Sequence, residues 1–160
     1  MLSPQQVIDL QKANGTFGIE KDLPANLTIH LLYDVWTDGS CRPNPGAGGW
    51  AAYAPDGNID ISGHADYATN NEMELTAILN ALKAVPFGSS VRINSDSELA
   101  IGWIVNGWNC KANPRNKVLI DLILDLTRTH QLFVSYRWTR GKVDSNTKYV
   151  DHVAKARCKA

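Results

Sequence analysis

The segment Thr69-Asn70-Asn71-Glu72-Met73-Glu74-Leu75 decides the fold, because it joins a polar stretch to the start of an apolar helix and carries an acid at that junction. Two more segments, Thr37-Asp38-Gly39-Ser40 before it and Ser95-Asp96-Ser97 after it, also place an acidic side chain at the edge of a predicted element. A fourth acid, Asp151, lies near the start of the last predicted helix. Four carboxylates gathered at one place are typical of a site for divalent cations.

The apolar pattern around these segments predicts a mixed α/β fold in the order β-β-β-α-β-α-α-β-α, with helices on the faces of the sheet. A Pro- and Gly-rich stretch over 43–49 is expected to be a loop. The expected strands cover 27–38, 50–54, 59–67, 91–96 and 132–138, and the expected helices cover 71–84, 98–105, 117–129 and 148–158.

Residues 1–26 are expected to form a separate N-terminal appendage, and residues 27–160 the main domain. Ser3-Pro4-Gln5-Gln6 favours a helix start, and the short helix that follows through about Lys12 is closed by Asn14-Gly15. The appendage holds two lysines and three acids, so it is not a basic tether for nucleic acid.

The composition is that of an ordinary globular protein, with 44% apolar and 20% charged residues. No apolar run reaches the ~18 residues of a membrane span, and the N-terminus lacks a signal-peptide pattern. The three cysteines are widely spaced and form no C-x-x-C pair, which argues against disulfides or a zinc site. We therefore expect a cytoplasmic protein without disulfides that makes no membrane contact.

The net charge of zero conceals an uneven distribution. Residues 1–102 carry 5 basic and 12 acidic side chains, whereas residues 103–160 carry 11 basic and 4 acidic ones. One interpretation is a solvated surface of uneven charge. The other is an acidic pocket that attracts metal beside a basic face that attracts phosphate.

Each of the four acids also has a purely structural explanation. Asp38 is expected to end the first strand and Asp96 the fourth, so either can serve only a turn or a helix start. Glu74 and Asp151 are expected in the first turns of their helices, where Glu74 can complete a capping box with Asn71 and Asp151 can complement the helix dipole. Together, however, the four carboxylates would repel one another unless a cation neutralised them.

Oxygen ligands without histidine or cysteine favour Mg²⁺ or Mn²⁺. Two such ions ~3.5–4 Å apart activate a water and stabilise the leaving oxygen of a phosphate ester. The residues alone thus predict metal-dependent phosphodiester hydrolysis.

Over about residues 30–158 the chain resembles the type 1 ribonuclease H family. The resemblance implies a five-stranded mixed sheet in the order 3-2-1-4-5 with helices on both faces. It also implies that Asp38, Glu74, Asp96 and Asp151 bind two metal ions and cut the RNA strand of an RNA–DNA hybrid, leaving 5′-phosphate and 3′-hydroxyl ends. The motifs that carry it are Thr37-Asp38-Gly39-Ser40-Cys41 with Asn44-Pro45-Gly46, Thr69-Asn70-Asn71 with Met73-Glu74-Leu75, Ser95-Asp96-Ser97, and Trp138 with Gly141 before Asp151.

The same resemblance supplies candidates for substrate binding. The positions that match contacts to the minor groove and the RNA 2′-hydroxyls are Gly39, Ser40, Cys41, Asn44, Asn70 and Asn71. Thr69 matches a residue that grips a phosphate of the DNA strand, and Asn116 is a candidate for a second such contact.

Three features depart from the family pattern. Lys142 stands where the family often has a loop histidine, and a lysine with a pKa near 10.4 does not shuttle protons at pH 7, so we expect slower turnover. Glu98 stands where well-known members have glutamine, and it can still accept a hydrogen bond from a 2′-hydroxyl. The basic handle after the second helix is short, which predicts weaker hybrid binding; its remaining residues are Trp103, Trp108, Lys111, Arg115 and Lys117.

The leading hypothesis is therefore a monomeric, magnesium-dependent hybrid endonuclease. A catalytically weak or inactive hybrid-binding module is the alternative that Lys142 motivates. A DNA nuclease or transposase-like relative on the same fold is a third, and Asn44, Asn70 and Asn71 argue against it.

Overall fold

The computed structural model describes residues 32–110 and 113–159. The expected N-terminal appendage, the first five residues of the expected first strand, and Lys111 lie outside the described residues. The elements of the described part are β1 Leu32–Arg42, β2 Gly46–Ala54, β3 Ile59–Ala68, α2 Asn70–Lys83, β4 Ser90–Ser95, α3 Glu98–Val105, α4 Pro114–Thr129, β5 Phe133–Trp138 and α5 Ser145–Arg157.

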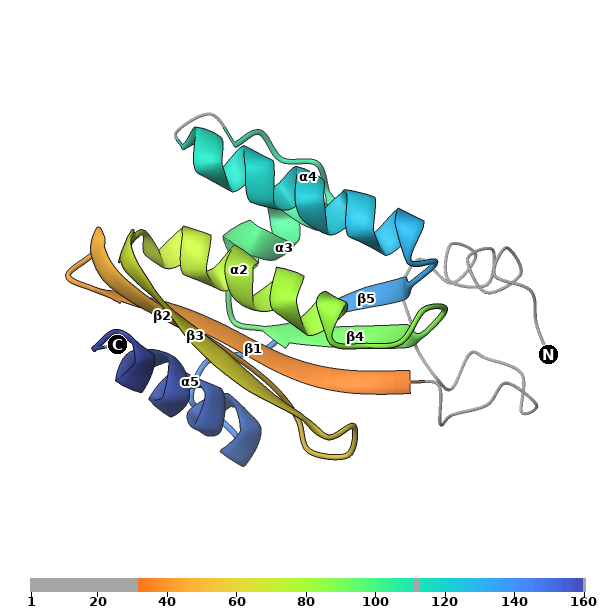
Figure 1. Cartoon of the computed structure of the whole chain (residues 1–160), viewed down its shortest axis with the longest axis horizontal. Coiled ribbons are helices and arrows are strands. Elements are labelled where there is room, and N and C mark those ends of the chain that lie inside the picture. Colours follow the sequence, from red (N-terminus) through yellow and green to blue (C-terminus); the bar gives the residue numbers. More distant parts are fainter. Residues whose placement is uncertain (1–31, 111–112, 160) are drawn as a thin grey trace.

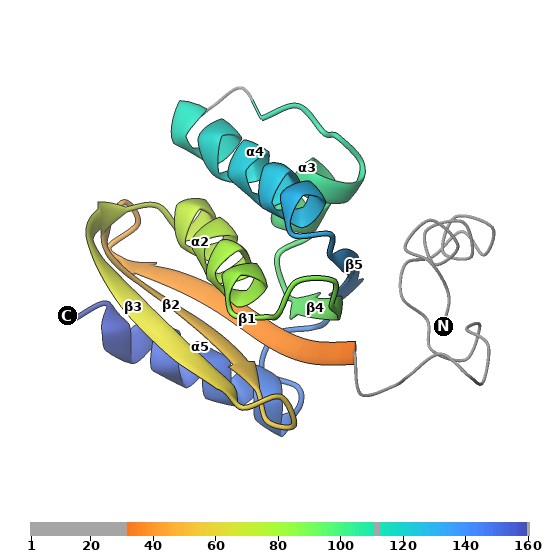
Figure 2. The same ribbon diagram turned by 45° about the vertical axis from the view of Figure 1, so that its right-hand side comes forward.

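The strands form one mixed sheet in the order β3-β2-β1-β4-β5, which confirms the expected topology. β1, β2 and β3 pair antiparallel as a meander, whereas β4 runs parallel to both β1 and β5. Helices α2, α3 and α4 cover one face of the sheet and α5 covers the other, as Figures 1 and 2 show. Among the described residues, no helix has the length and apolar character that a membrane span requires.

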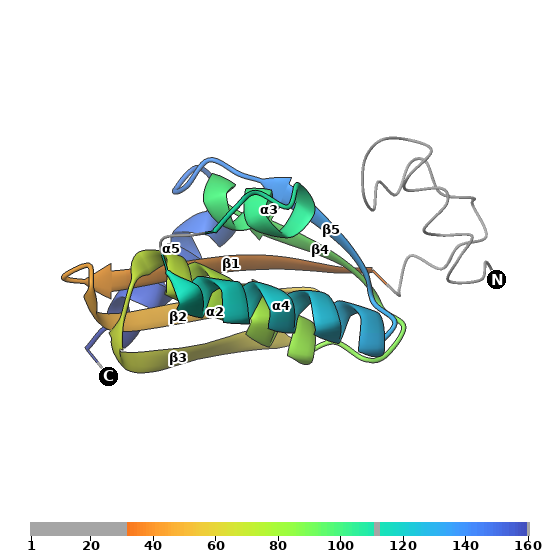
Figure 3. The same cartoon turned by 90° about the horizontal axis from the view of Figure 1, so that it is seen from above.

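The main core lies between the sheet and α2, where aliphatic side chains at 3–4 spacing point inward. Seen from above, α2 and α4 lie over the strands, and α3 lies beside β4 and β5 (Figure 3). The largest fully buried apolar side chains are Leu75, Ile78, Leu82, Ile93, Ile123, Val35 and Val91. A smaller cluster of Ala51, Val150 and Ala154 holds α5 against the other face.

The expectation that β1 ends at Asp38 is wrong. β1 continues to Arg42 and β2 begins at Gly46, because small residues keep the two strands paired almost to the turn, with Cys41 opposite Gly48. The pairing of β1 with β4, however, ends at Trp36 and Asn94. Asp38 therefore lies inside a strand, at the point where β1 and β4 separate.

The expected helix starts also need correction. Thr69, not Asn71, caps α2, since its Oγ1 accepts a hydrogen bond from the Glu72 N–H at 3.2 Å, and Glu74 consequently lies beyond the first turn. α5 starts three residues earlier than expected, because Asp144 caps it in a capping box with Thr147. Asp151 likewise lies beyond the first turn of α5. α4 also starts three residues early, at Pro114 after the N-cap Asn113.

Candidate metal centre

Three of the four predicted carboxylates meet at the point where β1 and β4 separate. Asp38, Glu74 and Asp96 each offer an oxygen atom, and these atoms all lie within 4.8 Å of one another. Asp38 and Glu74 are buried, with exposed fractions of 7% and 8%, whereas Asp96 is exposed. We call these three side chains the carboxylate cluster.

The local sequence explains how β1 and α2 come close enough to form this cluster. Gly39 packs on the backbone of α2, and a Cβ atom there would stand 2.2 Å from the Met73 carbonyl carbon. The Gly39 N–H also donates a 2.9 Å hydrogen bond to Asp38 Oδ1. A glycine after Asp38 is thus required by the close approach of the strand to the helix.

Asp96 is held by the strand next to it. The Trp138 Nε1 donates to the Asp96 carbonyl at 3.1 Å, and the Thr139 N–H donates to the Ser95 carbonyl at 2.9 Å. The loop after β5 then passes over the carboxylate, since a Cβ atom on Gly141 would stand 2.6 Å from Asp96 Oδ2. The glycine expected before Asp151 therefore has a direct role in shaping the cluster.

Burial and mutual repulsion act on all three carboxyl groups. Burial first, and then the charge of Asp96, raises the pKa of Asp38 to about 7. Burial and the charge of Asp38 raise the pKa of Glu74 well above its ordinary value. Partial desolvation raises the pKa of Asp96 even though its side chain reaches the surface, with the charge of Asp151 adding to the rise and that of Lys142 opposing it. This concentration of negative charge favours a cation.

The donor set fits a divalent cation. Glu74 Oε2 is buried and has no hydrogen-bond partner among the described residues, which is costly unless a ligand contacts it. The ligand atoms are all carboxylate oxygens, the type that Mg²⁺, Mn²⁺ and Ca²⁺ prefer.

Asp151 is close to the cluster but does not join it. Its charge acts on both Asp38 and Asp96, yet its Oδ2 accepts a hydrogen bond from Lys155 Nζ at 3.0 Å. The pair lies one helical turn apart on α5, at the i,i+4 spacing that favours such contacts. Lys155 is a residue that the sequence interpretation missed, although this spacing is visible in the sequence.

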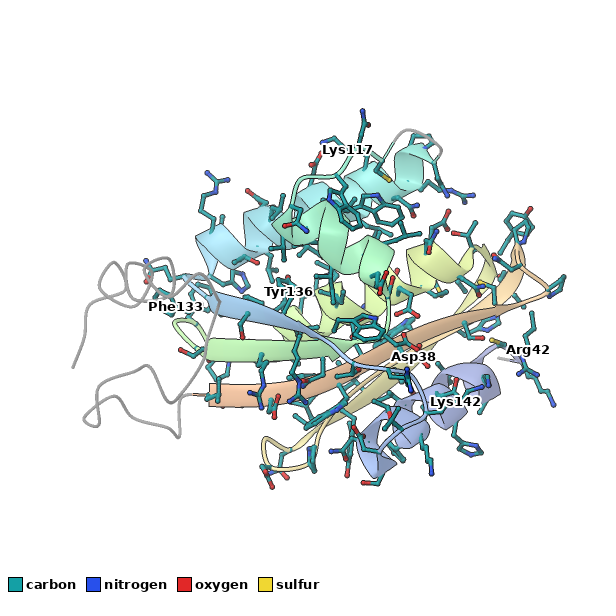
Figure 4. All side chains as sticks on the ribbon, turned by 180° about the vertical axis from the view of Figure 1, so that it is seen from behind. Asp38, Arg42, Lys117, Phe133, Tyr136 and Lys142 are labelled. Carbon is teal, nitrogen blue, oxygen red and sulfur yellow. The ribbon has the colours of Figure 1, made fainter. Side chains whose placement is uncertain are left out.

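Lys142 lies in the loop after β5, on the side of the molecule that carries Asp38 (Figure 4). It is exposed, and its charge opposes the rise in the pKa of Asp96. Glu98, also exposed, is the first residue of α3, two residues after Asp96.

The predicted groove-binding residues form a hydrogen-bonded set next to the cluster. The Cys41 N–H donates to Asn70 Oδ1 at 2.7 Å, and the Asn70 N–H donates to Asn44 Oδ1 at 3.0 Å. Both contacts use the amide oxygens and orient the Nδ2 donors of the two side chains. The Ser40 carbonyl accepts a contact from Cys158 Sγ at 3.3 Å. Cys41, Cys110 and Cys158 are free thiols.

A pocket between the starts of α2 and α4 brings together residues that are far apart in the sequence. Among the described residues, its lining holds neither acidic nor basic side chains. Asn116, which is only 4% exposed, has a buried Oδ1 without a partner among the described residues. We call it the amide pocket, after its polar lining residues Asn44, Thr69, Asn71, Asn109, Asn113 and Asn116.

Of the aromatic residues in the expected handle, Trp103 packs against the main core. Trp108 is 50% exposed. Its ring packs so closely on Gly102 of α3 that a Cβ atom at Gly102 would stand 2.0 Å from it. Trp108 thus combines packing with an exposed face.

The fold and the carboxylate cluster define a class of protein. Its members bind divalent cations through carboxylate oxygens, and here the amide pocket lies close to that site. Comparison with known proteins narrows the class. The model of the RNase H family matches residues 32–159. Ribonuclease H of Acidiphilium cryptum is 37% identical over 138 residues, covering 78% of this chain and 85% of that protein. Ribonuclease H of Granulibacter bethesdensis is 38% identical over 122 residues, covering 69% and 80%.

Solved structures agree on the fold. RNase H1 from the archaeon Halobacterium salinarum superposes with a TM-score of 0.64 at 24% identity, covering 80% of this chain and 98% of that one. LC11-RNase H1 in complex with an RNA/DNA hybrid gives a TM-score of 0.60 at 21% identity, covering 79% and 96%. The chain belongs to the ribonuclease H family, and it is a metal-dependent endoribonuclease.

Proposed function

We propose that this protein hydrolyses the RNA strand of RNA–DNA hybrids at a site built from Asp38, Glu74, Asp96 and Asp151. The observation that carries the proposal is the carboxylate cluster, in which Glu74 lies beside two further carboxylates and has a buried oxygen without a partner among the described residues. A relative of the same fold, LC11-RNase H1, has been solved with an RNA/DNA hybrid, which supports this choice of substrate.

The cofactor we propose is Mg²⁺, with two ions bound and Mn²⁺ as a substitute. When bound, such a pair activates a water and stabilises the leaving oxygen of an in-line displacement. Asp38, Glu74 and Asp96 would hold the ions, and Asp151 would complete the ligand set if its contact with Lys155 gave way. The expected products carry 5′-phosphate and 3′-hydroxyl ends.

Recognition of the hybrid falls to the residues around the β1–β2 turn and the start of α2. Backbone groups of Gly39, Ser40 and Cys41 and the side chain of Asn71, together with the oriented amides of Asn44 and Asn70, contact base edges and 2′-hydroxyls in the minor groove. Glu98 at the start of α3 adds an acceptor for a 2′-hydroxyl. The 2′-hydroxyl contacts explain why the RNA strand would be the one that is cut.

The DNA strand is proposed to bind at the amide pocket. Thr69 and Asn116 line it, and no acid lines it in the part of the chain that the structure describes, so amide and hydroxyl donors are left to meet a phosphate. Lys142, exposed beside Asp96, attracts the backbone of the substrate and does not act as a proton shuttle.

The domain that carries this activity is proposed to span residues 27–160 and to act as a monomer in a reducing, cytoplasmic setting. The three residues of the carboxylate cluster all come from one chain, which supports a site that is built within a single molecule.

A substrate panel tests the proposal. The protein is incubated with Mg²⁺ and a labelled hybrid, double-stranded RNA, or double-stranded DNA of one sequence, and the ends of the products are analysed. Cleavage confined to the RNA strand of the hybrid, with 3′-hydroxyl ends, is the expected result. Binding of the hybrid without cleavage in Mg²⁺ or Mn²⁺ would instead identify a binding module, and cleavage of the DNA duplex would identify a DNA nuclease.

A further inference from the structure

Glu72 is a buried carboxylate outside the metal centre, with an exposed fraction of only 5%. Its Oε1 accepts a 2.7 Å hydrogen bond from Asn113 Nδ2 and a 3.1 Å contact from Arg115 Nε. Burying a carboxylate is costly unless it is paired and hydrogen-bonded. Both of its partners come from one short segment about 41 residues further along the chain, so the contact joins two distant elements.

The two elements are the walls of the amide pocket. On one side, the Glu72 N–H donates to Thr69 Oγ1 at 3.2 Å, which fixes the N-cap of α2. On the other side, Asn113 is the N-cap of α4, and its carbonyl accepts a 3.1 Å hydrogen bond from the Asn116 N–H. Glu72 therefore holds Thr69 through its backbone and the first turn of α4 through its side chain.

Arg115 lies between the lining residues Asn113 and Asn116 in the sequence, and its side chain is 60% exposed. Its contact with Glu72 uses Nε, so the N–H groups at the far end of the guanidinium can still donate to a second acceptor. A guanidinium held in this way is well suited to a phosphate. It also neutralises Glu72, whose charge would otherwise repel an anion in the pocket.

We propose that Glu72 is a positioning residue, which orients Arg115 and the first turn of α4 so that Arg115 and the amide pocket bind one phosphate of the DNA strand. This inference rests on the proposed function, because it assigns a determinant of hybrid affinity to the same enzyme. It predicts that Glu72 affects binding of the hybrid and leaves the chemistry at the carboxylate cluster intact.

The variants separate charge, orientation and packing. Removing a hydrogen bond to a charged group costs about 1.5–3 kcal/mol, so Glu72→Ala is expected to raise the KM for the hybrid roughly tenfold or more, with kcat within about twofold of the wild type. Glu72→Gln keeps the acceptor and the shape of the side chain, and should recover part of that loss. Arg115→Ala should be worse than the double variant Glu72→Ala/Arg115→Ala, because the single change leaves a buried carboxylate beside the bound phosphate.

The experiment measures kcat, KM and thermal stability of these variants on a short hybrid whose DNA strand carries a single methylphosphonate at successive positions. In the wild type, one neutral linkage should weaken binding more than its neighbours, and in Glu72→Ala that position should lose its effect. Asp125→Ala is the matched control, since Asp125 is an exposed acid elsewhere on α4 that pairs with Arg128.

Three outcomes would overturn the inference. In the first, Glu72→Ala and Glu72→Gln lower the melting temperature and leave the KM unchanged, which would make Glu72 purely structural. In the second, the sensitive phosphate position persists in both Glu72 variants. In the third, Arg115→Ala binds the hybrid as tightly as the wild type. The third test holds even if Glu72→Ala fails to fold, because Arg115 is exposed. If the wild type itself does not cleave the hybrid, it is the proposed function that fails.

Discussion

Gly39 of β1 lies against the backbone nitrogen of Glu74 in α2, so closely that a Cβ atom on Gly39 would stand 2.3 Å from that nitrogen. The strand and the helix are therefore nearer to each other than any side chain would allow. This approach brings the Asp38 carboxylate, one residue before Gly39, within reach of the Glu74 carboxylate. The spacing of the metal centre thus depends on a residue that contributes no ligand.

Gly39→Ala should consequently damage metal binding more than folding. The added methyl group must push α2 away from β1, at a cost of about 1–3 kcal/mol in the free energy of unfolding. The displacement separates Asp38 from Glu74, so we expect at least tenfold weaker binding of Mn²⁺ by calorimetry. Gly57→Ala is the control, because its nearest contacts are ring atoms of Tyr33, away from the carboxylates. Equal metal affinity in the two variants would contradict the role given to Gly39.

The carboxylate cluster should make the metal-free protein less stable as the pH rises. Burial raises the pKa of Asp38 from its ordinary 3.8 to about 7, so between about pH 4 and pH 7 the folded protein binds more protons than the unfolded chain. The free energy of unfolding in EDTA should therefore fall across this window, and Glu74, whose pKa is also raised, should add to the fall.

Asp38→Asn removes the charge that burial disfavours. In EDTA at pH 8 we expect this variant to be more stable than the wild type, by on the order of 1 kcal/mol or more, and to lose part of the pH dependence. Urea unfolding at pH 5 and pH 8 measures both effects, with Asp56→Asn, an exposed acid, as the control. If the stability of the wild type in EDTA rises from pH 5 to pH 8, the pKa values of these carboxyl groups are not raised in the folded protein.

Lys155 should weaken the binding of cations at Asp151. Its Nζ contacts Asp151 Oδ2 at 3.0 Å. A divalent ion bound to Asp151 would therefore lie close to this positive charge and be repelled by it. A unit charge ~4 Å away is worth about 1 kcal/mol in water, so Lys155→Gln should tighten Mn²⁺ binding severalfold, as measured by calorimetry without substrate. The loss of stability should stay below about 1 kcal/mol, as for other partly exposed ion pairs. Lys148→Gln, an exposed change on the same helix, should alter neither quantity, and identical isotherms for all three proteins would refute the competition.

Lys142→His should accelerate the reaction. Lys142 has a φ of 62°, a left-handed conformation in which histidine is comparatively frequent, so the substitution is expected to fit the loop. An imidazole there can exchange protons near neutral pH, and we expect kcat to rise about tenfold or more between pH 7 and pH 8. Lys142→Ala serves as the control for loss of the charge. If the pH–rate profile of Lys142→His matches that of Lys142→Ala, the imidazole transfers no proton in the rate-limiting step.

The sequence predicted the parts of the structure that depend on local patterns. The sheet order came with the family resemblance, and α3 occupies the residues predicted from its apolar run and the stop at Gly107. The two early helix starts were also visible in principle, since Asp144 and Thr147 form a capping box and Asn113 precedes Pro114. The late start expected for α5 is the reason why Asp151 was predicted in the first turn, although it lies beyond that turn.

What the sequence did not reveal are contacts between distant segments. Glu72 stands inside the most informative segment of the chain, yet nothing local connects it to Asn113 and Arg115, which reach it only when α2 and α4 pack together. The continuation of β1 past Asp38 likewise depends on pairing with the glycines of β2, which were read as a loop. Tertiary contacts, not local propensity, decide both features.

The most direct test of the central claim is a Mg²⁺ titration of the cleavage of a hybrid labelled on its RNA strand, for the wild type and for Asp38→Asn. We expect the wild type to cut the RNA strand with a rate that rises with Mg²⁺ and vanishes in EDTA. Asp38→Asn should lose on the order of a thousandfold in rate at any Mg²⁺ concentration, because it removes a central ligand worth several kcal/mol in the transition state. Cleavage by Asp38→Asn at the rate of the wild type, or cleavage that persists in EDTA, would contradict the assignment of the metal centre.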